Sequence, residues 1–155
     1  MIKQATHEDK FDFVAMLQEY YQETAYKDFM TLDCVSFLEI LTQSITDDIV
    51  LVSELDGKKT GFCIINFYKT FFKEHEANIS LFYVRPEHRK SGISRELAKQ
   101  AVDLAASRKN VKIIHTATIA RIDEKSEAQF VNMFAKLGFD RCGANLQKRT
   151  NHGEV

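Results

Sequence analysis

The chain has 155 residues, of which 45% are hydrophobic and 28% are charged, and its formal net charge is −1. The length is typical of one globular domain, and the balanced charge excludes a general basic surface for nucleic acid. No stretch approaches the roughly 20 apolar residues that span a bilayer. We therefore expect one domain over residues 1–150, a frayed tail at residues 151–155, a cytoplasmic location, and neither a nucleic-acid nor a membrane partner.

The three cysteines show no spacing that is typical of a disulfide framework, and the five histidines show none that is typical of a metal site. Cys34, Cys63 and Cys142 are odd in number and widely separated, which predicts free, mostly buried thiols in a reducing compartment. The histidines form no H-x-x-H or H-E-x-x-H motif, so we expect no metal ion.

In chain order, the first half predicts two helices followed by a hairpin. Asp56-Gly57 is a strong signal for a two-residue turn between antiparallel strands. The predicted elements are strand Ile2–Ala5, a helix capped by Thr6, a helix with Phe37, Leu38, Leu41 and Ile45 on its apolar face, and strands Ile49–Val52 and Gly61–Phe67.

The second half alternates strands and helices. The predicted elements are strand Ile79–Val84, helix Ser91–Ser107, strand Val111–Thr118, helix Glu124–Leu137 and strand Phe139–Leu146. A strand-helix-strand unit requires parallel neighbours, whereas the Asp56-Gly57 hairpin is antiparallel, so the sheet is predicted to be mixed.

The stretch from Tyr83 to Arg95 contains the most informative pattern. It leads from a predicted strand into a predicted helix and contains four cations, which are Arg85, Arg89, Lys90 and Arg95. A helix N-terminus carries partial positive charge, so cations there are unfavourable unless an anion binds. Free backbone N–H groups and Gly92 would complete a phosphate site. The alternative is a solvated basic turn whose charge is offset by Glu87 and Glu96.

This pattern resembles one protein family. The sequence Arg89-x-x-Gly92-x-Ser94 is similar to the Arg/Gln-x-x-Gly-x-Gly/Ala motif of the GNAT superfamily of N-acetyltransferases, most of all its short bacterial and phage-borne members. The opening helices, the Asp56-Gly57 hairpin and the closing Phe134–Phe139 segment also fall where that family has them. The G-x-x-x-x-G-K-[ST] and G-x-G-x-x-G motifs of nucleotide-binding proteins are absent.

The resemblance implies an α/β (α+β) fold with a mixed, mostly antiparallel sheet of about six or seven strands and about four helices. It also implies an acetyl-CoA cleft between splayed strands Ile79–Val84 and Val111–Thr118, and transfer of the acetyl group to a primary amine by direct attack on the thioester. The cofactor-binding residues would be Phe82, Tyr83, Val84, Arg89, Lys90, Ser91, Gly92, Ile93, Ser94 and Arg95.

The chain departs from the family where catalysis is expected. Many members have a carboxylate on the strand before Tyr83, where this chain has Asn78 to Leu81, and many have a tyrosine where this chain has Phe134. The catalytic candidates are therefore Tyr83, His115 and Ser80. The alternative function is a GNAT-fold module that binds acyl-CoA or a protein partner without turnover.

Several residues have two interpretations. His115 would accept a proton if it faces the cleft, or would make a core hydrogen bond, and Glu76 would act through a water or is a solvated charge. Only one of Phe82 and Tyr83 should face the cleft, because side chains alternate along a strand. An aromatic run predicts an acceptor pocket, a homodimer contact or the rim of the core: Phe67, Tyr68, Phe71 and Phe72.

Overall fold

The computed structural model describes residues 1–28, 30–117 and 124–142. Its strands are β1 (Ile2–Gln4), β2 (Ile49–Leu55), β3 (Lys58–Lys69), β4 (His75–Val84) and β5 (Val111–Thr116). Its α-helices are α1 (Lys10–Gln22), α2 (Cys34–Asp47), α3 (Ile93–Ser107) and α4 (Glu124–Ala135). Short 3₁₀ turns cover His7–Asp9, Ala25–Asp28 and Pro86–Ser91.

The five strands form one sheet in sequence order, from β1 at one edge to β5 at the other. Neighbours from β1 to β4 pair antiparallel, and β4 pairs parallel with β5 across α3. The turn between β2 and β3 has positive φ at both Asp56 (51°) and Gly57 (75°), as the hairpin turn that matches strand twist requires. The predicted mixed sheet is therefore confirmed.

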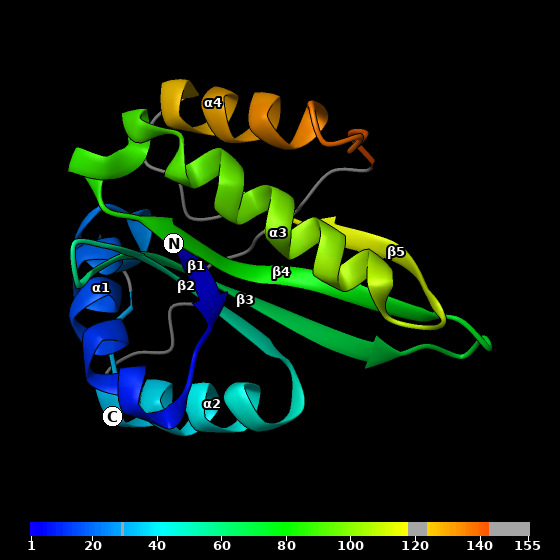
Figure 1. Ribbon diagram of the computed structural model, residues 1–155, viewed down its shortest axis with the longest axis horizontal. Coiled ribbons are helices and arrows are strands. Elements are labelled where there is room, and N and C mark those ends of the chain that lie inside the picture. The colour runs from blue at the N-terminus through cyan, green and yellow to red at the C-terminus, as the bar shows by residue number, and fades with distance from the viewer. Residues whose placement is uncertain (29, 118–123, 143–155) are drawn as a thin grey trace.

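Helices cover both faces of this sheet, α1 and α2 on one face and α3 and α4 on the other (Figure 1). Successive side chains of β2 point to opposite faces of the sheet and therefore belong to two different cores. Val50 and Val52 pack with α1 and α2, whereas Ile49 and Leu51 pack with α3 and α4. The molecule is a three-layer α/β/α sandwich, and it has an apolar core on each side of the sheet.

The strands β4 and β5 separate part-way along their length. Their last paired residues are Ile79 and Thr116, and β4 then continues to Val84 without a β5 partner among the described residues. The neighbouring β3 stays paired with β4 up to Gly61 and Val84. The edge of β4 beyond Ile79 therefore has no strand partner on the β5 side among the described residues, where splayed strands were expected.

The structure corrects several predicted boundaries. It contains five strands in the described residues, where six or seven were expected: Phe139–Cys142 is not a strand, and residues 143–146 and the tail at 151–155 lie outside the described residues. The strand β4 begins at His75, and α3 begins at Ile93 after a 3₁₀ turn. The turn of 86–91 forms because Pro86 favours a helical start whereas Gly92 has φ of 89°.

One expectation about burial was wrong in part, and the aromatic run divides between its interpretations. Of the three cysteines only Cys63 is buried, while Cys34 is partly exposed and Cys142 is exposed. In the aromatic run, Phe67 packs against the core, but Phe71 and Phe72 are fully or largely exposed at the tip of the β3–β4 hairpin. A hairpin tip extends past both helical layers, so no helix covers its side chains (Figure 1). None of the described helices is long and apolar enough to cross a bilayer.

Candidate active site

The connection from β4 to α3 presents free backbone N–H groups. Gly92 precedes the first residue of α3, and the first N–H groups of a helix have no acceptor within the helix. No atom lies within 4 Å of a Cβ built on Gly92, so the space beside this turn is open. The helix start at Ile93–Arg95 is therefore exposed to a ligand and carries the partial positive charge that favours an anion.

Two of the four cations in this stretch form ion pairs with carboxylates at the C-terminal end of α1. The guanidinium of Arg89 lies 2.5 Å from a carboxylate oxygen of Glu23, and that of Arg85 lies 2.9 Å from Glu19. The expected counter-charges, Glu87 and Glu96, are not the partners of these arginines. The sequence could not indicate α1, because more than 60 residues separate the partners.

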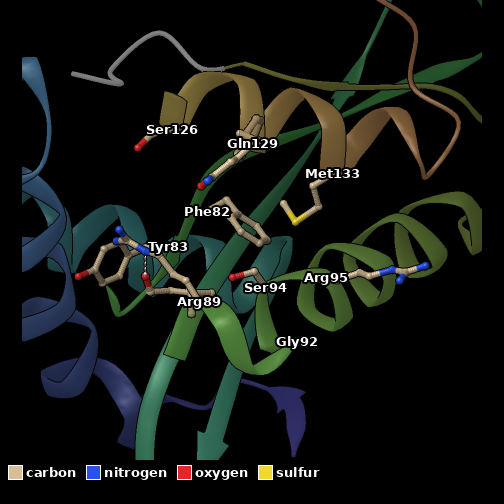
Figure 2. Close-up of a pocket in the computed structure, with 11 residues that line it drawn as sticks. Phe82, Tyr83, Arg89, Gly92, Ser94, Arg95, Ser126, Gln129 and Met133 are labelled. Carbon is tan, nitrogen blue, oxygen red and sulfur yellow. Dashed lines mark hydrogen bonds between the residues drawn. The ribbon is translucent and has the colours of Figure 1, made fainter. Parts of the chain in front are cut away.

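A pocket of about 250 Å³ lies between this connection, the end of β4 and α4 (Figure 2). Seven of the ten predicted cofactor-binding residues line it: Phe82, Tyr83, Val84, Arg89, Gly92, Ser94 and Arg95. Lys90, Ser91 and Ile93 belong to the same connection but do not line the pocket. The start of α3, the side chain of Phe82 and Arg89, which is already paired with Glu23, therefore lie around one cavity.

The sequence interpretation missed the wall of the pocket that α4 supplies. This wall consists of Ser126, Gln129, Phe130 and Met133. Their i, i+3, i+4, i+7 spacing places them on one face of a helix, and this signal could have identified them. In Figure 2, Gln129 and Met133 reach from α4 toward Phe82.

Tyr83 lines the pocket, but its ring packs in the core on the α1 and α2 side of the sheet, and its hydroxyl points toward the C-terminal end of α1. The phenol oxygen lies 3.2 Å from carboxylate oxygens of both Glu19 and Glu23. Burial raises the pKa of the Tyr83 phenol well above its ordinary value, and the two carboxylates raise it further. The phenol is therefore neutral, and its single O–H donates to one of these two carboxylates.

Ser80 occupies an irregularity in β4. Leu81 pairs with Ile64 and Ile79 pairs with Ile65, so Ser80 has no β3 residue opposite it and forms a β-bulge. The side chain is exposed, and its Oγ donates to Oδ1 of Asn66 at 2.6 Å. Ser80 is also the first β4 residue beyond the last pair with β5.

His115 and Glu76 form a pair on the same face of the sheet as Ser80. Nε2 of His115 lies 3.3 Å from Oε2 of Glu76, and both side chains are about two-fifths exposed. Ile114 packs into the core beneath α3, so its neighbour His115 faces the opposite side. Ser80 and His115 thus lie on the α2 side of the sheet, whereas the pocket opens on the side of α3 and α4.

A sequence profile of the Acetyltransferase (GNAT) family matches residues 11–139. The chain belongs to this family. An uncharacterized N-acetyltransferase from Archaeoglobus fulgidus is 31% identical over 112 residues, which cover 69% of this chain and 74% of that protein. The GNAT membership confirms the resemblance drawn from Arg89 to Ser94, and it makes this chain an acetyltransferase enzyme.

Solved structures show the same fold at low sequence identity. A transcriptional regulator from Bacillus halodurans C-125 superposes with a TM-score of 0.75 and 20% identity, covering 97% of this chain and 99% of that one. A ribosomal-protein-alanine N-acetyltransferase from Brucella melitensis biovar Abortus 2308 gives a TM-score of 0.73 and 18% identity over the same shares. These two likenesses establish the fold alone, and the predicted GNAT-like α/β fold is confirmed.

The residue at the expected tyrosine position of this GNAT protein is buried in the core. The ring of Phe134 is 2% exposed and packs against Phe130 and Phe139, with ring centroids 4.7 Å and 5.1 Å away. Phe134 does not line the pocket, whereas Phe130 and Met133 of the same helix do. A hydroxyl at position 134 would therefore face an aromatic cluster instead of the pocket.

Proposed function

We propose that this GNAT enzyme transfers the acetyl group of acetyl-CoA to a primary amine by direct attack on the thioester. The observation that supports it most strongly is the pocket, in which the start of α3 and Arg89 adjoin the apolar side chain of Phe82. The pyrophosphate would bind the connection from Arg89 to Arg95, including Lys90, Ser91, Gly92, Ile93 and Ser94. The pantetheine arm would lie along Phe82–Val84, beside the unpaired edge of β4.

The chemistry requires a neutral amine and a route for its proton. The amine nitrogen forms a bond to the carbonyl carbon, the carbon–sulfur bond breaks, and CoA leaves as a thiolate. A thiol with a pKa of about 8.5 leaves without a dedicated proton donor at modest cost. The amine proton would pass to water or to the His115–Glu76 pair, which lies near the point where β4 and β5 separate.

The other two catalytic candidates differ in what they can contribute. Ser80 is exposed at the β4 bulge and would contact the amine directly. Tyr83 donates its single O–H to Glu19 or Glu23, so we assign Tyr83 to the support of the pocket edge. The acceptor is an unidentified primary amine, and the exposed Phe71 and Phe72 would contact that acceptor or a second copy of the chain.

Thermal shift and thiol release together test this proposal. Acetyl-CoA and free CoA should both raise the melting temperature, because both contain the pyrophosphate. Thiol release from acetyl-CoA should then depend on adding an amine from a panel of small amines, peptides and lysine derivatives. Stabilisation by CoA without thiol release at any pH would favour the alternative, a module that binds acyl-CoA without turnover.

A further inference from the structure

The Ser80 hydroxyl is the outer end of a hydrogen-bond chain that begins at a carboxylate. Ser80 Oγ donates to Asn66 Oδ1 at 2.6 Å, and Asn66 Nδ2 donates to Asp48 Oδ2 at 2.8 Å. The other carboxylate oxygen of Asp48 accepts the backbone N–H of Phe67 at 3.1 Å. Residues from the end of α2, from β3 and from the β4 bulge thus form one connected set.

The hydrogen bonds from Ser80 to Asp48 all point in one direction, because a carboxylate only accepts hydrogen bonds. Asp48 therefore requires the Nδ2 end of the Asn66 amide, and the Oδ1 end must then face Ser80. An amide oxygen likewise only accepts, so Ser80 donates its single O–H to Asn66 at 2.6 Å, and the backbone carbonyl of Ile64, 3.4 Å away, is the weaker alternative acceptor. The lone pairs of Ser80 Oγ remain free to accept a hydrogen bond from outside.

The charge of Asp48 also affects Ser80. Hydrogen bonds in a chain polarise one another, so each donor that points toward Asp48 increases electron density on the next oxygen outward. Ser80 Oγ is consequently a better acceptor than an isolated serine hydroxyl. Residues 78–81 of β4 include no carboxylate, and Ser80 among them thereby presents an oxygen whose acceptor strength comes from Asp48, at the end of α2.

The position of Ser80 suits the acceptor amine. It lies two residues before Phe82, which lines the pocket, and two residues of a strand span about 7 Å. Its side chain is exposed on the face of the sheet opposite α3 and α4. An amine that approached from the α2 side would meet Ser80 beside the edge of β4 where the thioester would lie.

We propose that Asp48 and Asn66 are positioning residues that orient the Ser80 hydroxyl to accept an N–H of the acceptor amine. Held in this way, the amine directs its own lone pair toward the thioester carbon. The inference rests on the proposed function, because it specifies how the same site holds its amine. In this role Ser80 only accepts a hydrogen bond, so no proton has to pass through the Asn66 amide.

Steady-state kinetics on the full chain test this inference through a double-mutant cycle. The variants are Ser80→Ala, Asn66→Leu and the double variant, measured with acetyl-CoA and the most active amine of the panel. Each single change should lower kcat/KM for the amine about 10-fold, the value of one hydrogen bond, while KM for acetyl-CoA stays unchanged. The double variant should be no worse than either single variant, because both changes remove the same interaction.

Three further variants separate positioning from structural support. Ser44→Ala is the matched control, since Ser44 Oγ also accepts from Asn66 Nδ2, at 3.4 Å, but lies outside the connection from Asp48 to Ser80, and it should keep wild-type kinetics. Ser80→Thr should retain activity because it keeps the hydroxyl. Asp48→Asn is nearly isosteric, but its amide would favour a flipped Asn66 and a reversed Ser80 hydroxyl, so it should match Ser80→Ala at an unchanged melting temperature.

Two results would overturn the inference, and they are distinguishable. If the wild type is active and the losses of Ser80→Ala and Asn66→Leu multiply in the double variant, the residues act independently and the inference fails alone. If the wild type acetylates no amine, the proposed function fails and the inference fails with it.

Discussion

Arg89 is bound to the last residue of the strand that precedes it: its Nε donates to the carbonyl oxygen of Val84 at 2.7 Å. The same guanidinium contacts Glu23 and lies over the ring of Tyr83, 5.6 Å from its centroid. The connection between β4 and α3 is therefore attached to both the sheet and α1. We expect the pocket edge to be formed before any ligand binds.

Gly92→Glu should abolish the thermal stabilisation by CoA. A glutamate at the start of α3 would place bulk and negative charge in the open space beside the helix N-terminus. At a CoA concentration of 100 times Kd, the wild type should gain about 2.7 kcal/mol, and the variant should gain none.

Gly92→Ala provides the control for backbone strain. Alanine at φ of 89° should cost about 1–2 kcal/mol of stability, but no atom lies near its Cβ. This variant should melt earlier and still respond to CoA. A CoA response in Gly92→Glu equal to that of Gly92→Ala would show that the phosphates bind elsewhere.

His115→Ala should lower the rate of acetyl transfer by at most about 10²-fold, the lower end for a positioned acid–base group. Glu76→Gln should have a similar or smaller effect, because Glu76 acts on the amine only through His115. Activity should rise with pH toward the pKa of the acceptor amine itself. A bell-shaped pH profile whose acidic limb disappears in Glu76→Gln would instead identify Glu76 as a dedicated base.

Phe134→Tyr should destabilise the protein without increasing turnover. The new hydroxyl would be buried against Phe82, Phe130 and Phe139, where an unpaired hydroxyl costs about 1–3 kcal/mol. Chemical denaturation measures the loss, and kinetics at low temperature measure turnover. A faster enzyme of wild-type stability would mean that position 134 reaches the acetyl-CoA site.

The double variant Phe71→Ser/Phe72→Ser should keep the wild-type melting temperature and CoA response, because both rings are exposed. It should alter either the KM for the amine or the mass in solution, measured by light scattering. Phe67→Ser on the same hairpin is the control. It should lower the free energy of unfolding by about 3 kcal/mol, because Phe67 packs against the core and under Arg108. Unfolding of the double variant would contradict this account.

Asp9→Asn should lower stability by about 2 kcal/mol at pH 7, the cost of losing hydrogen bonds to a charged group. Asp9 accepts the N–H of Thr6 at 2.8 Å and lies 2.9 Å from Nζ of Lys59. Burial tends to raise the pKa of Asp9, but the Thr6 N–H and Lys59 outweigh it and lower the pKa below its ordinary value.

The pH dependence of this effect follows from the sign of the shift. A carboxyl whose pKa is lower in the folded state stabilises the protein above its unfolded pKa, about 3.9, and loses this contribution as the pH falls through the folded pKa. The difference between wild type and Asp9→Asn should therefore be constant from pH 5 to 8 and shrink below about pH 4. Urea denaturation at several pH values measures it, and a difference that did not decrease at all below pH 4 would exclude this ion pair as its source.

The sequence by itself determined the local features of this protein. The Asp56-Gly57 turn and the apolar spacing of the helices depend on neighbouring residues, and both appear as predicted. The motif from Arg89 to Ser94 likewise indicated the GNAT family, because a glycine at a helix start among cations is a local pattern.

The tertiary structure decided which distant side chains meet, because such contacts depend on how the layers pack. It paired Arg89 with Glu23, placed one face of α4 over the pocket, and enclosed Phe134 in an aromatic cluster, although a tyrosine there looks isosteric in the sequence. It also connected Asp48, through Asn66, to the Ser80 bulge, although residues 78–81 of β4 include no carboxylate. No sequence spacing encodes these pairs, since the chain crosses from one layer to another between their members.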